Sequence, residues 1–146
     1  MPDDKKDAER HIAITAANGH CGKAILELLL MNASFQGHYD SVTALVNHPN
    51  QENLEELKSM GAHVVDINKA KDLTAVMSKI DTLVCIPPAS EDKLKHVKMV
   101  LKAASEAKNV TNLILLSSAG CDYANRDEQV RSVLPPFGPF PLTSCI

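Results

Sequence analysis

The sequence predicts a doubly wound α/β domain, with five parallel strands in the order 3-2-1-4-5 and helices on both faces of the sheet. Short runs rich in aliphatic and β-branched residues alternate with longer segments of helical periodicity, which is typical of right-handed βαβ units. The strand runs are continuously apolar, as expected for parallel strands that are covered on both faces. A glycine-containing turn joins the first strand to the first helix.

The five expected strands are residues 11–16, 41–46, 63–66, 81–86 and 113–116. The second is rich in β-branched residues, which favour a pleated and buried surface. Pro49 follows the second strand and Pro87-Pro88 follows the fourth, and proline ends a central strand because it lacks an N–H group.

Caps and apolar stripes predict the helices. Residues 23–31 are apolar on more than one face, as in a helix packed tightly on a sheet. Asn50 and Ser90 are the expected N-caps of two later helices, and Gly61 is the expected stop of the first of these. The expected buried stripes are Leu54, Leu57 and Met60; Leu73, Val76, Met77 and Ile80; and Leu94, Val97, Leu101 and Ala104.

Composition excludes several classes of protein. The chain has 146 residues, of which 45% are hydrophobic and 23% charged, with a formal net charge of −3. These values suit a globular domain and provide no broad basic surface for nucleic acid. No apolar run approaches the roughly 20 residues that span a bilayer, and the charged N-terminus lacks a signal-peptide core. We therefore expect a cytoplasmic protein that binds neither membrane nor nucleic acid. The four cysteines and six histidines are dispersed, so we expect no metal site.

Three regions follow from the pattern. Residues 1–10 form a charged leader, residues 11–131 the expected α/β domain, and residues 132–146 a proline-rich tail. Proline at the density of this tail propagates neither helix nor central strand, so we expect an irregular end.

The turn after the first strand has the composition of a phosphate-binding loop. Its glycine spacing is occupied by Ala16, Gly19 and Gly22. Such a turn brings backbone N–H groups and a helix N-terminus close to a pyrophosphate, and glycine permits the close approach. The alternative is a tight βα turn with no ligand. The expected cofactor-binding residues here are Thr15, Ala16, Ala17, Asn18, Gly19, His20, Cys21 and Gly22.

This turn, the segment 42–49 and above all the segment 115–123 resemble the NmrA-like family of atypical short-chain dehydrogenase/reductases, with a likeness to fungal members in the last segment. The resemblance covers about residues 11–131. It implies a Rossmann domain that binds NADP or NAD, in proteins that act either as reductases or as redox-sensing regulators. A protein partner such as a transcriptional regulator is implied with it. The family's substrate-binding half has no counterpart here, so we expect a C-terminally truncated member.

Asn47 and His48 follow the second strand, where an arginine would select NADP and an acidic residue NAD. Asn47 can hydrogen-bond a hydroxyl or a phosphate but carries no charge, and His48 can supply a partial positive charge. The alternative for both is a plain turn at the end of a strand. The preference for NADP therefore comes from the resemblance alone. Pro87-Pro88 is expected to rim the cofactor cleft, with a rigid end to the strand as the alternative, and Ser117 is expected to contact the cofactor.

Ser118 matches the position of the family's catalytic serine, but no Tyr-x-x-x-Lys pair accompanies it. Tyr39 is followed four residues later by Thr43, and Tyr123 by Asp127. A carboxylate beside a tyrosine raises its pKa, which opposes proton transfer near neutral pH. Three hypotheses follow: a dinucleotide-sensing regulatory module with little or no catalysis, an NADPH-dependent oxidoreductase acting on a carbonyl or enone, and a truncated fragment that binds nothing.

Overall fold

The computed structural model describes residues 9–117, and the chain separates into two compact units, residues 1–115 and 116–146. The elements described here belong to the first unit. They are β1 (His11–Ile14), α1 (His20–Met31), β2 (Ser41–Val46), α2 (Gln51–Ser59), β3 (His63–Asp66), α3 (Leu73–Met77), β4 (Thr82–Cys85), α4 (Lys93–Ala107) and β5 (Asn112–Leu115). The expected proline-rich tail lies outside the described residues.

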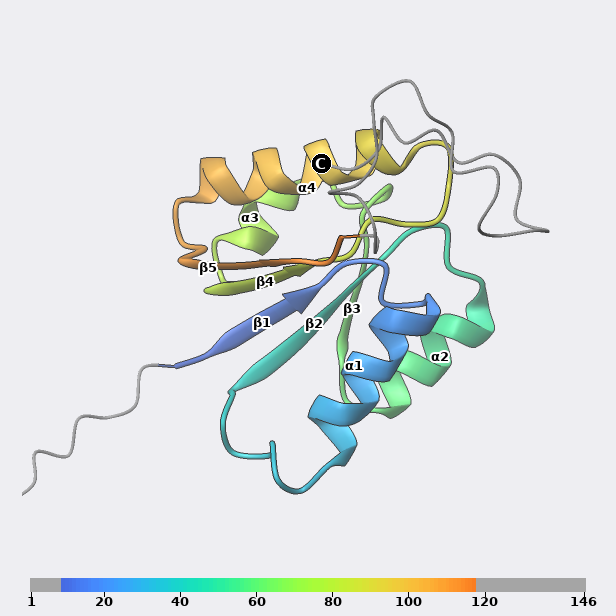
Figure 1. Ribbon diagram of the computed structural model, residues 1–146, viewed down its shortest axis with the longest axis vertical. Coiled ribbons are helices and arrows are strands. Elements are labelled where there is room, and N and C mark those ends of the chain that lie inside the picture. Colours follow the sequence, from blue (N-terminus) through green and yellow to red (C-terminus); the bar gives the residue numbers. More distant parts are fainter. Residues whose placement is uncertain (1–8, 118–146) are drawn as a thin grey trace, which may run out of the picture. The chain divides into compact units, whose positions relative to one another are not determined.

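The five strands form one parallel sheet in the order β3-β2-β1-β4-β5, as the sequence predicts. Helices α1 and α2 cover one face of this sheet, and α3 and α4 cover the other (Figure 1). Strands β1 and β4 are neighbours, but α1, which follows β1, and α4, which follows β4, lie on opposite faces of the sheet (Figure 1). In a doubly wound sheet, this switch point is where ligands bind.

The core between the sheet and the α3–α4 layer is built from alternate residues of neighbouring strands. Ala13, Leu45 and Leu83 point to this side and pack against Met77 and Val100 from the helices. On the opposite side, the alternation presents Ile14, Val42, Ala44 and Val46, and Leu26 of α1 and Leu57 of α2 are buried. Apolar burial on both faces explains why the strand runs are continuous.

Strand β5 departs from the expectation that every strand is covered on both faces. Leu113, Ile114 and Leu115 are 54%, 52% and 39% exposed. The strand is the last in the sheet order and pairs only with β4 among the described strands. Both of its faces are open within residues 9–117, so the prediction of two-sided cover holds for the inner strands only.

Three helix ends differ from the predictions. Helix α1 begins at His20, so the expected turn through Gly22 ends three residues earlier. Asp92, rather than Ser90, is the N-cap of α4, without a side-chain capping bond. Leu94 was expected in the buried stripe of α4 but is 43% exposed, because the stripe that faces the sheet is His96, Val97, Val100, Ala103 and Ala104. Asn50 does cap α2, accepting a bond from Asn53 N at 2.7 Å.

No helix within residues 9–117 has both the length and the apolar composition needed to cross a membrane.

Candidate functional site

Thr15 connects the carboxyl ends of β1 and β4. Its backbone N–H donates to Val84 O at 3.0 Å. Its hydroxyl donates to Ile86 O at 2.9 Å and accepts from Ile86 N at 2.6 Å. These buried bonds satisfy the backbone of Ile86 just beyond β4, where strand pairing no longer does so. Thr15 therefore shapes the edge of the sheet on which the site is built.

The turn from Ala16 to Gly19 is held by backbone bonds. Ala16 has a φ of +48°, in the left-handed region that favours glycine, at the position where the glycine spacing has its alanine. Ala17 is fully buried, and its N–H donates to Leu45 O at 3.2 Å. Gly19 N–H donates back to Ala16 O at 2.9 Å. The amides of Ala17 and Gly19 are thus already paired and are not free for a phosphate.

Gly22 lies in the first turn of α1 and allows the helix to approach the preceding turn closely. A Cβ atom at this residue would lie 2.3 Å from Ala16 O and 2.8 Å from Ala17 Cα. Both are backbone atoms, so a side chain has no space here. This close packing of the helix against the end of the strand is the physical reason for a glycine at position 22.

Within residues 9–117, the N-terminus of α1 presents unpaired backbone donors at the carboxyl edge of the sheet. Its N-cap is Gly19, which has no side chain to cap the helix, whereas Asn50 and Asp72 cap α2 and α3. The first intrahelical bond runs from Lys23 N to Gly19 O at 2.9 Å. The N–H groups of His20, Cys21 and Gly22 precede it and have no partner within the helix. They are the groups that bind an anion at a helix N-terminus.

Lys23 lies one residue further along α1 but is engaged by the neighbouring helix. It forms an ion pair with Glu56 of α2. The hydrogen bond with Glu56 raises the pKa of Lys23 above its ordinary value. Lys23 therefore ties the two helices on this face together.

Asn47 and His48, directly after β2, lie beside the turn. Asn18 Nδ2 donates to Asn47 O at 3.4 Å, which links the turn to the end of β2. The Asn47 side chain is held at both ends: Oδ1 accepts from Asn68 Nδ2, and Nδ2 lies 3.4 Å from His96 Nδ1. His48 has a φ of +47°, and its ring lies edge-on to that of His96 at 6.4 Å between centroids.

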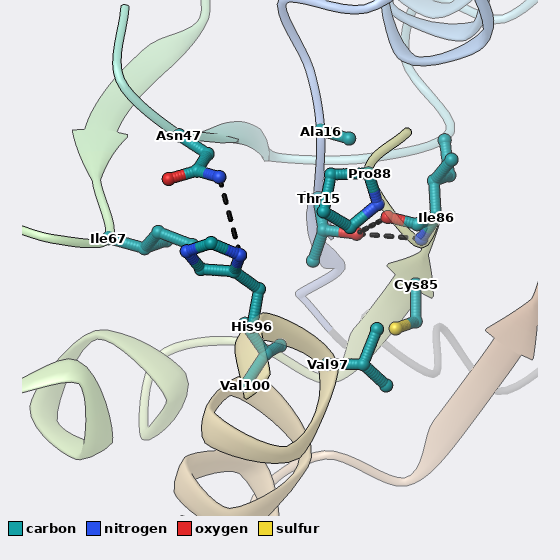
Figure 2. Close-up of a pocket in the computed structure, with 10 residues that line it drawn as sticks. All are labelled: Thr15, Ala16, Asn47, Ile67, Cys85, Ile86, Pro88, His96, Val97 and Val100. Atoms are coloured by element: carbon teal, nitrogen blue, oxygen red, sulfur yellow. Dashed lines mark hydrogen bonds between the residues drawn. The ribbon is translucent and has the colours of Figure 1, made fainter. Parts of the chain in front are cut away.

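A small pocket opens at this edge on the α4 side of the sheet (Figure 2). Residues from all four strands β1 to β4, or from the segments just after them, meet α4 there. The lining is mostly apolar, with polar atoms from Thr15, Asn47 and His96. Its residues are Thr15, Ala16, Asn47, Ile67, Cys85, Ile86, Pro88, His96, Val97 and Val100.

Three of the residues predicted from the sequence line this pocket: Thr15, Ala16 and Asn47. Of the two prolines expected at the rim, Pro88 is among the lining residues and Pro87 is not. Ser117 lies in the second unit, and Ser118 lies outside the described residues. The remaining predicted residues belong to the turn and the start of α1, or follow β2: Ala17, Asn18, Gly19, His20, Cys21, Gly22 and His48.

Sequence reasoning missed the contribution of α4. His96, Val97 and Val100 were not singled out together, because the stripe was placed on Leu94, Val97 and Leu101. Val97 and Val100 are three residues apart on one helical face, which is the signal that could have found them. The position of Ile67, directly after β3, is a second such signal.

The two described cysteines lie in different surroundings. Cys21 is exposed on the first turn of α1, and Cys85 is buried at the end of β4. Burial raises the pKa of the Cys85 thiol, against a smaller opposite effect of a hydrogen bond with Thr15. Cys121 lies outside the described residues.

The parallel sheet, its switch point and the uncapped glycine turn define a dinucleotide-binding domain of the Rossmann type. Comparison with protein families agrees: a family described as NAD(P)H-binding matches residues 16–138. The chain belongs to this NAD(P)H-binding family. A comparison with curated proteins gives no match.

Solved reductase structures share the fold. Triphenylmethane reductase from a Citrobacter species is 25% identical with a TM-score of 0.60, over 79% of this chain and 39% of that one. A second structure of that enzyme, complexed with NADP(H), is 25% identical with a TM-score of 0.58, over 77% and 39%. Isoflavone reductase is 24% identical with a TM-score of 0.60, over 86% and 41%. This chain therefore spans about two fifths of the length of these structures.

Proposed function

We propose that this chain is an NmrA-like dinucleotide-binding module that senses a nicotinamide dinucleotide and passes that state to a protein partner in the cytoplasm, with little or no catalysis of its own. The observation that carries the proposal is the uncapped N-terminus of α1, whose first three N–H groups have no partner among residues 9–117 and lie at the switch point of the sheet. A structural turn without a ligand would gain stability from a capping side chain, as α2 does from Asn50.

The arrangement suits each part of the dinucleotide. The pyrophosphate would lie against the amides of His20, Cys21 and Gly22, where the helix dipole favours negative charge. The adenine would occupy the apolar pocket against Val97 and Val100. The adenosine ribose would then lie at the end of β2. The nicotinamide, when bound, supplies the hydride chemistry, and the residues described here hold the other half of the molecule.

A regulatory role, rather than catalysis, is supported by the absence of a Tyr-x-x-x-Lys pair anywhere in the sequence. In this superfamily such a pair moves the proton that accompanies hydride transfer. A preference for NADP over NAD is supported by the resemblance to NmrA-like proteins and by the NADP(H) bound to the Citrobacter enzyme.

The proposal is tested by calorimetric titration of the whole chain with NADP⁺, NADPH, NAD⁺ and NADH, using a matched pair of variants at Gly19. Gly19 has φ −86° and ψ 170°, which aspartate and asparagine adopt readily at an N-cap. Gly19→Asp places a carboxylate over the free amides, and Gly19→Asn places a neutral group of the same shape there.

We expect both variants to be about as stable as the parent chain, because the gain of a capping side chain offsets the tight contact of the new Cβ atom with Ala16 O at 3.2 Å. Gly19→Asp should bind the dinucleotides at least about tenfold more weakly than Gly19→Asn, because only the carboxylate repels the pyrophosphate. Equal affinities of the two variants would contradict binding at this helix end. No binding by the parent chain would favour the third reading, a fragment that binds nothing.

A second candidate function is an NADPH-dependent oxidoreductase. It is favoured by the 25% identity to triphenylmethane reductase, an enzyme whose structure with NADP(H) matches this chain as well. Oxidation of NADPH in the presence of triphenylmethane dyes, carbonyls and enones tests it. The measurement uses protein already shown to bind NADPH, so that an absence of turnover supports the sensor and sustained turnover overturns it.

A further inference from the structure

His96 is a buried imidazole that the proposed binding mode does not use. It is 6% exposed, and its neighbours on the same face of α4 are the apolar side chains of Val97 and Val100. A buried polar ring is costly unless it is hydrogen-bonded. The partner of its Nδ1 atom is the amide of Asn47, 49 residues earlier in the chain (Figure 2). The structure thus joins the middle of the pocket wall to the end of β2.

The Asn47 amide is the middle member of a row of three contacting side chains, called the relay below: Asn68, Asn47 and His96. Asn68 Nδ2 donates to Asn47 Oδ1, and Asn47 Nδ2 faces His96 Nδ1. In this orientation Asn47 donates to the ring, so Nδ1 must be the unprotonated, accepting nitrogen. A ring protonated on Nδ1 can only donate, which requires the Asn47 amide to present its oxygen instead. Asn68 would then have to turn its own oxygen toward Asn47 Nδ2, so the state of His96 sets the orientation of both amides.

Asn47 lies where a dinucleotide-binding sheet distinguishes a 2′-hydroxyl from a 2′-phosphate on the adenosine ribose. We propose that His96 is a positioning residue for this distinction: through Asn47, it sets the preference between NAD and NADP. The inference rests on the proposed dinucleotide-binding function. With a neutral ring, the relay presents an uncharged amide that suits a hydroxyl. With a charged ring, the same corner gains a cation that suits a phosphate.

A single charge on this ring would be important for an anionic ligand, because the described residues that line the pocket include no lysine or arginine. Imidazole is the side chain that ordinarily changes charge between about pH 5 and 8. The His48 ring lies edge-on to the His96 ring, with 6.4 Å between their centroids. Asp66 at the end of β3 accepts from Asn68 N at 3.0 Å and pairs with Lys69 at 3.7 Å. Further ionisable groups in the described part of the chain are Cys85, which lines the pocket, and Asp92 and Lys93, which lie at the start of α4.

The test measures dissociation constants for NAD⁺ and NADP⁺ at about pH 8 and about pH 6, at constant ionic strength. We expect affinity for NADP⁺ relative to NAD⁺ to rise about tenfold toward the lower pH in the parent chain. His96→Asn places its Oδ1 close to the position of Nδ1 and keeps an acceptor for Asn47 without a titrating ring. This variant should lose the pH dependence of the ratio between the two dissociation constants.

His48→Asn is the matched control. Asparagine tolerates the left-handed backbone of His48, and the variant removes the neighbouring ring while leaving His96 in place. The 2′-phosphate titrates over the same range, but it does so equally with every variant, so differences between variants isolate the protein's contribution. The pH dependence should persist in His48→Asn. Its loss there, with persistence in His96→Asn, would assign the effect to His48 and overturn the proposal.

An NMR titration of the unmodified chain keeps the proposal testable if His96→Asn does not fold. NADP⁺ should move the protonation midpoint of the His96 ring upward, and NAD⁺ should leave it in place, because only NADP⁺ brings a phosphate near the ring. Equal midpoints in the two complexes would overturn the proposal while leaving dinucleotide binding intact. An absence of binding by either nucleotide would overturn both.

Discussion

Gly22→Ala is the substitution that most directly tests how the turn and α1 are built. The added Cβ would lie 2.3 Å from Ala16 O, 2.8 Å from Ala17 Cα and 2.9 Å from Ala16 C. To reach ordinary contact, the helix start and the turn must separate by about 1 Å. The turn cannot move freely, because Ala17 is buried and its N–H is bonded to Leu45 O at 3.2 Å.

Two opposing effects determine the magnitude. Overpacking of this kind costs about 1–3 kcal/mol, and a close contact with three backbone atoms belongs at the upper end. Alanine is favoured over glycine within a helix by up to about 1 kcal/mol, an effect that is weaker in the first turn. We therefore expect Gly22→Ala to lower the free energy of unfolding by about 2 kcal/mol, measured by urea denaturation followed by circular dichroism.

Gly19→Ala is the control for this experiment. Its Cβ meets one atom, Ala16 O, at 3.2 Å, and its φ of −86° is ordinary for alanine. The expected loss is below about 1 kcal/mol, from the poorer N-cap and the tight contact. The reasoning is refuted if Gly22→Ala is as stable as Gly19→Ala, because the close approach of α1 to the turn would then be absent in solution.

Three further predictions concern the edge of the sheet and α2. Thr15→Val should lower the free energy of unfolding by about 2 kcal/mol, because it leaves the buried N–H and C=O of Ile86 without their partner. Thr15→Ser keeps the hydroxyl and should keep most of the stability, and equal losses of the two variants in denaturation would contradict this. Asn50→Ala should cost about 1 kcal/mol in the same assay through loss of the α2 cap, and an unchanged midpoint would show that the cap is dispensable. Because burial raises the pKa of Cys85, its thiol ionises at a lower pH in the unfolded chain than in the folded chain. Its contribution to stability is therefore present below the ordinary value of 9.0 and is lost as the pH rises above it. The free energy of unfolding should fall less steeply with pH in Cys85→Ala, and parallel curves would exclude Cys85 as a source.

The fold could be predicted in detail where local pattern and tertiary environment agree. The runs 41–46 and 63–66 were predicted with the bounds that β2 and β3 have, because apolar strand residues are bounded there by turn signals. The cap at Asn50 was predicted correctly for the same kind of reason, since an N-cap is a local interaction between residues three apart.

Predictions were wrong where a residue's role depends on what packs against it. Gly22 was taken for the end of a loop, whereas the structure places it inside α1, where glycine is needed for close contact with Ala16 O. Leu94 was assigned to the buried face of α4, but the rotation of that helix turns it outward and His96 inward. When a helix carries apolar residues on two faces, periodicity alone does not tell which face packs against the sheet.

The sequence by itself determined the alternation of strands and helices, the order of the sheet and the glycine turn after β1, because these depend on periodicity, turn chemistry and the handedness of βαβ units. The tertiary structure alone decided which side chains form the pocket. Thr15, Asn47 and His96 are far apart in the chain and meet only because the ends of parallel strands and the start of α4 converge on one edge. The rotation of α4 about its own axis, which is set by packing on the sheet, is what brings His96 to Asn47.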